Sequence, residues 1–302
     1  MAVINRGSFL ALVKPDLLRV QVETGKRRPV EYTKVFNVTD MPFNPVTERQ
    51  ISGLGTLPEK PEGDAFTLDQ PYLGGTKTYT AVPYGSAVEI TYEMFRDDQY
   101  AAMREIIAEQ VKAAIHRQET VAWSVFNNAF DASVTGFDGK PLCATDHPYL
   151  DGSANTQANR PTVDTGLSVT GLQNALIAFE NLKDGRGLPR LLSPTRLLVS
   201  PSNRFVAREI LGSSQAPYKA DNEINALVED DLSFMVVHYF TNATQWFLTC
   251  NQGDHDLNYY WRDQPIYDSY EDPRTKNGVF TVYERMVAGF GSWAGVYGSK
   301  AS

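Results

Sequence analysis

The stretch RDDQYAAMREIIAEQVKAAIHRQETVAWSVFNNAF, residues 96–130, decides the fold of this chain. It contains neither Gly nor Pro, and Asp97 and Asp98 near its start are of a residue type that often caps helices. Apolar side chains recur at helical spacing and form a face that only Gln118 interrupts: Met103, Ile107, Val111, Ala114, Val121, Val125 and Ala129. The pattern predicts one helix over residues 97–130, which at 1.5 Å per residue would be roughly 50 Å long.

This helix is far longer than the average globular helix of about three turns. A two-helix hairpin is the alternative, but the stretch contains no turn-forming residues. A coiled coil is disfavoured because the chain has no second helix of comparable length to pair with. Trp123 lies off the apolar face, near His116 and Thr120, and indicates either a second packing surface or a partly exposed ring.

Composition describes an ordinary globular chain. Its 302 residues are 42% hydrophobic and 21% charged, enough for one large or two smaller domains. The net charge is −8 and the cations are scattered, which argues against sequence-directed nucleic-acid binding; only the short run Lys26-Arg27-Arg28 could touch a phosphate backbone. No segment approaches the roughly eighteen apolar residues of a membrane span, and no signal-peptide core is visible. Cys143 and Cys250 have no metal or redox spacing, so we expect free thiols in a cytosol.

The residues before the helix differ in character from those after it. Residues 1–47 contain four prolines and little periodicity, which predicts an extended arm. Residues 48–85 are rich in Gly and Pro, and the alternating pieces 65–68 and 77–82 flank the turn-forming pair Gly74-Gly75. We therefore predict a long β-hairpin. Because an isolated hairpin is marginal in water, we expect it to lie on another subunit, with packing on its own domain as the alternative.

A strand over residues 87–94 is predicted to lead into the long helix. After the helix, the sequence predicts a second helix capped by Thr170 and ending at residues 184–187, a buried strand at 196–199 and a third helix at 203–211. The remainder is mainly β, with strands expected at 234–240, 245–250, 258–261 and 278–287 and a Gly-aromatic tail. Together these elements predict a mixed α and β fold.

No motif in the chain indicates a particular catalytic or metal-binding activity. Cys143, Asp146 and His147 could form a nucleophile and base, but three such residues in one turn-rich loop more often close the loop. The run Asp254-His255-Asp256 offers metal ligands, although strand alternation would send His255 away from its neighbours. His238 is expected to be a buried core residue. We therefore assign no catalytic, cofactor-binding or metal-binding residues, and we predict that the protein is not an enzyme and holds no cofactor.

The order of arm, Gly/Pro-rich hairpin, strand ending in Glu-Ile-Thr-Tyr-Glu-Met (residues 89–94), acidic residues and very long helix is unusual. It resembles the major capsid proteins of tailed bacteriophages with the Hong Kong 97-type fold, especially the Mu-like head subunits. Further stretches carry the resemblance, which spans about residues 30–300: Tyr84-Gly85, residues 197–201 with the following helix, residues 222–227, and the β-rich C-terminal segment with Arg285.

The resemblance implies an α+β fold of the Hong Kong 97 type in four parts. Residues 1–47 would form the N-terminal arm and residues 48–87 the extended loop, a β-hairpin. Residues 88–140 and 257–289 would form the peripheral domain, with the spine helix at 97–130. Residues 141–256 and 290–302 would form the axial domain.

The resemblance also implies a function. The chain would be a major capsid subunit that self-assembles, as pentamers and hexamers, into an icosahedral head enclosing double-stranded DNA without sequence-specific contact. It would act in the virion after assembly in the host bacterial cytoplasm, with a separate scaffolding protein, a portal and possible decoration proteins as partners, and no membrane. The alternatives are an encapsulin-like nanocompartment shell and a cytosolic hydrolase that uses one of the two His-containing loops.

Some members of this family join a loop lysine to an asparagine of a neighbouring subunit. Lys60 and Lys77 lie in the predicted hairpin region, but no sequence motif identifies partners for them. The resemblance therefore leaves open whether such crosslinks form here.

Overall fold

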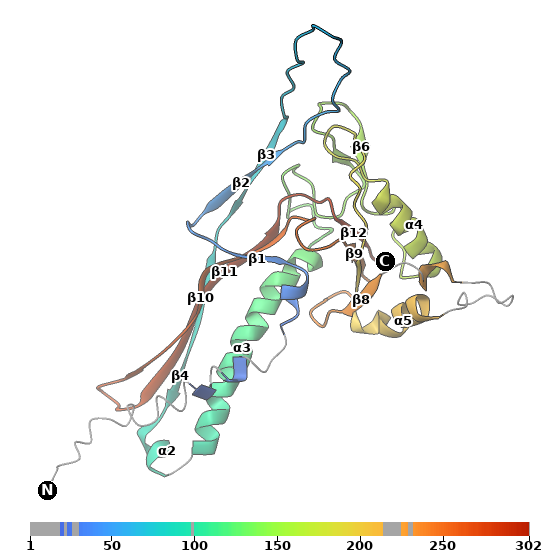
Figure 1. Ribbon diagram of the computed structural model, residues 1–302. Helices are drawn as coiled ribbons and strands as arrows, with labels where there is room; N and C mark the ends of the chain where they lie inside the picture. The colour runs from blue at the N-terminus through green and yellow to red at the C-terminus, as the bar shows by residue number, and fades with distance from the viewer. Residues whose placement is uncertain are drawn as a thin grey trace.

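The computed structural model describes residues 19–20, 23–25, 30–97, 100–213, 225–228 and 232–301. The basic run Lys26-Arg27-Arg28, the expected helix cap Asp98 and residues 222–224 lie outside the described residues. In the described part, the chain forms two four-stranded sheets, one long helix and a protruding hairpin (Figure 1).

The first sheet is built mainly from two long antiparallel strands near the C-terminus. Its strand order is β1 (Asn37–Asp40), β10 (Leu257–Glu271), β11 (Gly278–Phe290) and β4 (Val82–Ile90), and only β1 and β10 run parallel. β10 extends well beyond the predicted segment 258–261. Register shifts between Trp261 and Ile266 accommodate Pro265, a residue type that usually ends a strand.

The long helix α3 (Tyr100–Asn127) lies along one face of this sheet, against β11 and β4 (Figure 1). The prediction of a single long helix is confirmed, and the two-helix alternative is wrong. Met103 and Ile107 are fully buried, and they pack with Ile90 and Phe280 of the sheet. Gln118, which interrupts the apolar face, is also buried and donates a hydrogen bond to Glu284 of β11.

A short helix, α2 (Tyr92–Arg96), takes the place of the end of the predicted strand over residues 87–94. β4 ends at Ile90, and Thr91 Oγ1 accepts a hydrogen bond from the backbone N–H of Met94 at 3.3 Å, which favours a helical turn there. The backbone N–H of Asp97 donates to Glu93 O at 2.9 Å. Asp97 therefore closes α2, and the long helix begins later than residue 97.

The second sheet lies beyond the C-terminal end of α3 (Figure 1). Its strand order is β12 (Val296–Ser299), β9 (Trp246–Thr249), β7 (Arg196–Val199) and β8 (Ser233–Val236), with only β7 and β8 parallel. The predicted buried strand at 196–199 is confirmed, because the side chains of Leu197, Leu198 and Val199 are fully buried.

Two helices pack on the second sheet, α4 (Val169–Glu180) and α5 (Arg204–Gly212). The cap of α4 is Ser168, not Thr170: Ser168 is extended, and its Oγ accepts from the backbone N–H of Gly171 at 3.1 Å. Thr170 lies inside the first turn. The described residues also include three short 3-10 helices and a two-stranded ribbon: η1 (Tyr32–Lys34), η2 (Pro201–Asn203), η3 (Ala226–Val228), β5 (His147–Pro148) and β6 (Thr156–Gln157).

The largest apolar core joins the arm, the C-terminal half of α3 and both sheets. Trp123 is fully buried there, with its ring 5.8 Å from Phe36 and 5.6 Å from Phe126 between centroids. The suggestion of a partly exposed ring is therefore wrong, and the second packing surface is correct. The arm is part of this core, because Tyr32, Val35 and Phe36 are buried in it.

The predicted hairpin exists, but its strands are not the expected ones. β2 (Val46–Ile51) pairs antiparallel with β3 (Leu73–Tyr79), whereas residues 65–68 are irregular. The expected turn pair Gly74-Gly75 lies inside β3, where a Cβ on Gly75 would come within 2.0 Å of Phe137 O. The glycine thus permits a close approach of two backbones rather than a turn.

The division into arm, extended loop, peripheral domain and axial domain stays a prediction. β4 begins at Val82, inside the range 48–87 assigned to the loop, and continues into the first sheet. The chain therefore passes from strand β3 of the hairpin almost directly into strand β4 of the sheet that supports α3.

Candidate functional site

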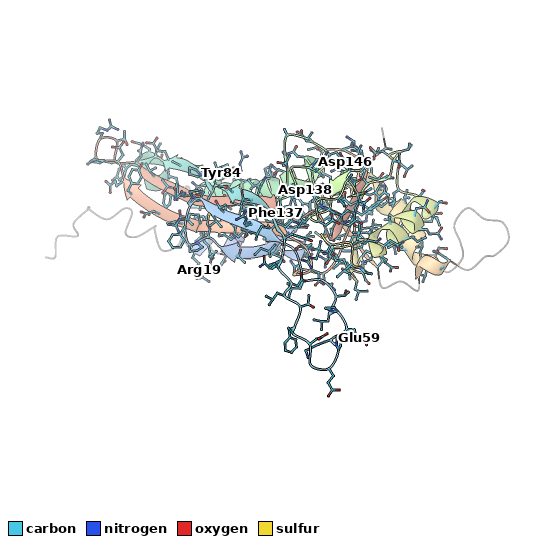
Figure 2. All side chains as sticks on the ribbon, turned by 90° about the horizontal axis from the view of Figure 1, so that it is seen from above. Arg19, Glu59, Tyr84, Phe137, Asp138 and Asp146 are labelled. Carbon is cyan, nitrogen blue, oxygen red and sulfur yellow. The ribbon has the colours of Figure 1, made fainter. Side chains whose placement is uncertain are left out.

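The loop that joins the two hairpin strands projects from the body of the molecule. Figure 2 shows its side chains, with Glu59 far from the sheets. The base of the loop is closed at Ser52 and Tyr72: Ser52 N donates to Tyr72 O at 2.9 Å, and Tyr72 N donates to Ser52 Oγ at 2.8 Å. Residues 53–71 thus form a protrusion with a defined base.

Large apolar side chains are concentrated on this protrusion and on the strand ends beside it. Six of them, here called the loop apolar set, are 60–97% exposed: Ile51, Leu54, Leu57, Phe66, Leu68 and Leu73. A concentration of exposed apolar side chains on one segment often marks a contact site with another molecule. The loop apolar set is therefore the strongest candidate for a contact surface.

A second exposed surface, which mixes large apolar and polar side chains, lies on the face of the first sheet opposite α3. Glu284 and its neighbours at even positions of β11 face α3 and are buried, whereas Tyr283 points the other way and is exposed. Tyr283 pairs with Ile266 of β10, which is also exposed, as is Tyr270. Alternation along both strands therefore places these three side chains on one face, which the described residues leave exposed.

Of the two lysines considered for crosslinking, Lys77 is held within its own chain. Its Nζ donates to Thr135 O at 2.6 Å, and burial lowers its pKa. Lys60 lies exposed on the loop, 5.1 Å from the ring centroid of Phe66. Of the two, Lys60 is the one placed where a neighbouring molecule could reach it.

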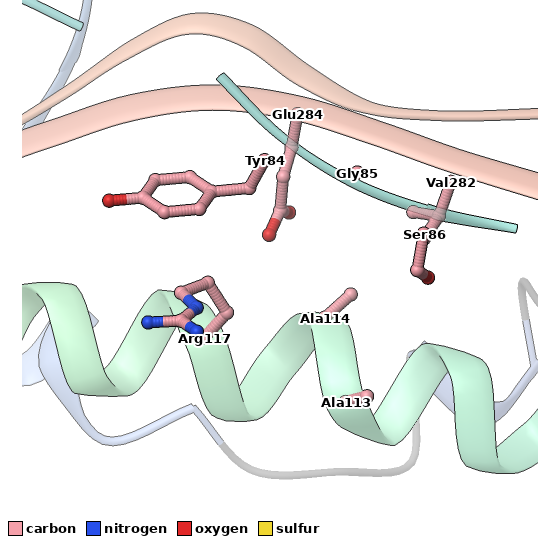
Figure 3. Close-up of a pocket in the computed structure, with 8 residues that line it drawn as sticks. All are labelled: Tyr84, Gly85, Ser86, Ala113, Ala114, Arg117, Val282 and Glu284. Atoms are coloured by element: carbon pink, nitrogen blue, oxygen red, sulfur yellow. The ribbon is translucent and has the colours of Figure 1, made fainter. Parts of the chain in front are cut away.

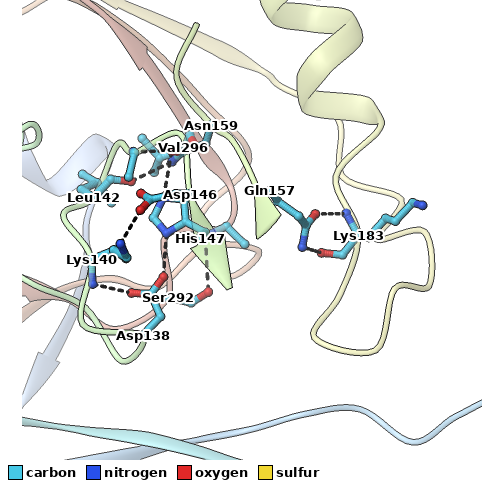
Figure 4. A network of polar contacts seen from close by, with 12 residues as sticks. Asp138, Lys140, Leu142, Asp146, His147, Gln157, Asn159, Lys183, Ser292 and Val296 are labelled. Atoms are coloured by element: carbon cyan, nitrogen blue, oxygen red, sulfur yellow. Dashed lines mark hydrogen bonds and ion pairs between the residues drawn. The ribbon is translucent and has the colours of Figure 1, made fainter. Parts of the chain in front are cut away.

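His147 does not form a catalytic pair with Cys143. Its Nδ1 lies 2.6 Å from Asp138 Oδ2, and its Nε2 lies 3.0 Å from Asn159 Oδ1 (Figure 4). Asp146 forms an ion pair with Lys140 instead, and burial raises the pKa of the Cys143 thiol well above its usual range. The loop-closing interpretation of these residues is therefore the one that the contacts support.

Within the run Asp254-His255-Asp256, the side chains of His255 and Asp256 have separate hydrogen-bond partners. His255 is buried, its Nδ1 accepts from Leu257 N at 3.3 Å, and burial lowers its pKa. Asp256 accepts from the backbone N–H of Ser292 at 3.2 Å. Among the described residues, no group of three or more His, Cys, Asp or Glu side chains is placed to hold a metal ion.

The prediction that His238 is a core residue is wrong. β8 ends at Val236, so His238 lies outside the strand that was expected at residues 234–240. The His238 side chain is 66% exposed, and its Nδ1 lies 2.5 Å from Glu31 Oε1 of the arm. The residue therefore ties the arm to the surface of the second sheet.

A buried carboxylate that was not predicted from the sequence lies beneath the long helix. Glu284 is only 2% exposed and borders a cavity of about 220 Å³ between α3 and strands β4 and β11 (Figure 3). Arg117 lies on the helix side, with its guanidinium 5.3 Å from the Tyr84 ring centroid. Burial raises the pKa of Glu284 to about 6, against the opposing effects of the Gln118 hydrogen bond and the Arg117 charge. The alternation in β11 could have revealed it, since Glu284 shares a face with Phe280, Val282 and Met286.

Replacing Glu284 by Gln should stabilise the subunit at alkaline pH. The folded-state pKa of about 6 exceeds the ordinary value of 4.5, so the folded state favours the protonated acid. The stability that this preference contributes is present below pH 4.5 and is lost as the pH rises through 6. We expect a gain of about 1 kcal/mol for Glu284→Gln at pH 8, after allowance for solvent screening, and almost none at pH 4.5.

Denaturant unfolding of unassembled subunits at both pH values would measure this difference. Glu105→Gln is the matched control, because Glu105 lies on the exposed face of α3. An equal gain at both pH values would show that the carboxylate is not destabilised by burial.

No helix in the described ranges is both long enough and apolar enough to cross a membrane.

Comparison with known protein families identifies the family of this chain. The profile of the family described as phage capsid protein matches residues 75–299, more than half of the chain. The chain therefore belongs to the phage capsid protein family. It is a structural protein of the virion capsid, and the prediction of a major capsid subunit is confirmed. A search of curated proteins found no match.

Solved structures show the same fold at low sequence identity. The procapsid of bacteriophage JBD30 matches with a TM-score of 0.57 at 15% identity, covering 98% of this chain and 76% of that one. The capsid of cyanophage P-SCSP1u matches with a TM-score of 0.57 at 11% identity, covering 91% and 89%. A virus-like particle from Pyrococcus furiosus matches with a TM-score of 0.56 at 10% identity, covering 95% and 98%. The predicted α+β fold of the Hong Kong 97 type is confirmed.

Proposed function

We propose that this chain is the repeating subunit of a closed icosahedral phage head, assembled from pentamers and hexamers in the host cytoplasm around packaged double-stranded DNA. The observation that carries the proposal is the loop apolar set, which the described residues leave exposed on and beside a protrusion. Closing a shell requires heterologous contacts between identical subunits, and such contacts would cover this surface. The role is structural rather than catalytic.

A neighbouring copy offers a matching surface. The exposed face with Ile266, Tyr270 and Tyr283 combines these apolar side chains with polar ones such as Asp268 and Thr281 and belongs to a four-stranded sheet, so it offers places for side chains of the loop apolar set. The net charge of −8 suits a wall that confines DNA without holding its phosphates. A separate scaffolding protein and a portal complete the proposed partners, with possible decoration proteins on the shell.

Light scattering after size-exclusion chromatography, together with negative-stain electron microscopy, tests the proposal on the purified full chain, alone and with a co-expressed scaffolding protein. Closed shells, tubes or rings of five and six subunits are the expected result. Uniform small oligomers under both conditions would overturn it.

An encapsulin-like shell that encloses protein is the second candidate, because a structure described as a virus-like particle, and not as a phage capsid, shares the fold over 98% of its chain. The contents of purified particles separate the two: a phage head should package DNA when its packaging partners are present, whereas a nanocompartment would retain protein cargo.

A further inference from the structure

A rigid turn faces the base of the protruding loop. After α4, the chain forms the turn Asp184-Gly185-Arg186-Gly187, which the sequence marked only as a helix end. Asp184 Oδ1 accepts from the backbone N–H groups of Arg186 and Leu188 at 2.8 and 2.9 Å. Gly187 has φ +84°, and Gly185 packs so tightly on Leu150 that a Cβ would lie 2.8 Å from it. The turn therefore fixes the backbone position of Arg186.

From this position Arg186 contacts the loop. Two segments of the loop, here called its limbs, are held together there: the outgoing limb at Gly55 and the returning limb at Asp69 and Gln70. Its Nη1 and Nη2 donate to the two carboxylate oxygens of Asp69 at 2.7 and 2.9 Å, and Nη2 also donates to Gln70 O at 2.6 Å. Asp69 Oδ2 in turn accepts from the backbone N–H of Gly55 on the outgoing limb at 2.7 Å. The guanidinium lies 4.5 Å from the ring centroid of Tyr72. One planar group thus connects the two limbs to the turn.

The contact between Arg186 and Asp69 is more enclosed than an ordinary surface ion pair. The Arg186 side chain is only 12% exposed, although Asp69 is 41% exposed. The guanidinium and the Gly55 N–H together lower the pKa of Asp69, which keeps the carboxylate charged. A guanidinium fork can hold both carboxylate oxygens while it stacks on a ring, and a lysine cannot reproduce this geometry. Within the described ranges, Arg186 is the only residue outside 52–72 that hydrogen-bonds residues 53–71.

We propose that Arg186 is a positioning residue for assembly, which holds the protruding loop at a fixed angle before a neighbouring subunit binds. The inference rests on the proposed function, because the loop must meet a second copy of this chain. Without the clamp, the loop samples many orientations and only a fraction of subunits is ready to bind. Apparent affinity falls in proportion to that fraction.

Spin labels test the clamp on unassembled subunits, independently of shell formation. Cys143 and Cys250 are buried, so labels can be directed to Glu62→Cys on the loop and Gln173→Cys on the exposed face of α4. We expect a narrow distance distribution between the labels in the parent chain and a broad one with Arg186→Ala or Arg186→Lys. Arg186→Glu combined with Asp69→Arg should narrow it only in part, because the exchange restores the ion pair but not the hydrogen bonds to Gly55 and Gln70. Arg190→Ala, which alters an exposed arginine of the same segment, should leave the distribution narrow.

Assembly of the same variants without labels supplies the second measurement. If the loop keeps its orientation only about a tenth of the time, the subunit concentration needed for assembly should rise about tenfold for Arg186→Ala. It should stay unchanged for Arg190→Ala and recover in part with the charge exchange. An unchanged distance distribution in Arg186→Ala would overturn the clamp whether or not shells form. A broadened distribution with unchanged assembly would overturn its role in assembly. Absence of shells in the parent chain would count against the proposed function alone.

Discussion

Replacing residues 53–71 by an Asn-Gly turn is expected to abolish closed shells while leaving the subunit folded. The hydrogen bonds between Ser52 and Tyr72 close the hairpin at the same place, so a two-residue turn suits the shortened loop. Residues 53–71 contribute no side chain to the buried cores of the described residues. The loss therefore falls on contacts between subunits rather than on folding.

The expected effect on assembly is large. The deletion removes four of the six side chains of the loop apolar set. At about 1 kcal/mol for each, their contacts in one subunit amount to about 4 kcal/mol, or roughly 10³-fold in an association constant. Electron microscopy and size-exclusion chromatography would measure the loss of shells, and circular dichroism would measure retention of the fold.

A milder variant keeps the loop length. Replacing three exposed loop residues by Ser, at Leu57, Phe66 and Leu68, should also prevent closure of the shell. The control Val163→Ser, at an exposed apolar residue outside the loop, should not. Global unfolding of the deletion variant would show that the loop belongs to the subunit core. Normal shells from it would exclude the loop from the assembly contacts.

Replacing Trp123 by Ala is expected to cause the largest loss of subunit stability, about 3–5 kcal/mol. The indole is fully buried and packs edge-on against Phe36 of the arm and Phe240. Its Nε1 donates to Glu119 Oε2 at 2.8 Å. Truncation would therefore leave a cavity and remove a donor from a buried carboxylate at the same time.

The loss of stability on replacing Trp123 by Ala should extend to the N-terminal arm. Glu119 also accepts from the backbone N–H groups of Glu31 and Tyr32 at 2.5 and 3.2 Å, and burial raises its pKa. Urea unfolding of unassembled subunits would measure the effect, with Trp123→Phe as the control that keeps most of the apolar contact and removes only the donor. A loss below about 1 kcal/mol for Trp123→Ala would mean that the ring does not join the arm to α3.

The sequence alone was sufficient for the elements whose information is local. The helix around residues 100–127 and the strand at 196–199 were predicted because helical spacing and a short buried run are encoded in consecutive residues. The order of such elements was also enough to indicate the capsid fold, since the resemblance depends on succession along the chain. The sequence also led to the expectation that the hairpin lies on another subunit, but the exposed apolar residues of the loop were identified only in the structure.

Tertiary structure decided what depends on partners distant in the sequence. Residues 46–51, not 65–68, pair with β3, because pairing is selected by contacts across the hairpin and not by the alternation of either strand. Trp123 is buried because the arm, nearly ninety residues earlier, covers the side of α3 that one apolar stripe does not describe. Arg186 meets Asp69 across 117 residues, and Glu284 meets Gln118 across 166. Periodicity reports which face of an element is apolar, whereas the identity of its partner is set only when the folded chain brings distant surfaces together.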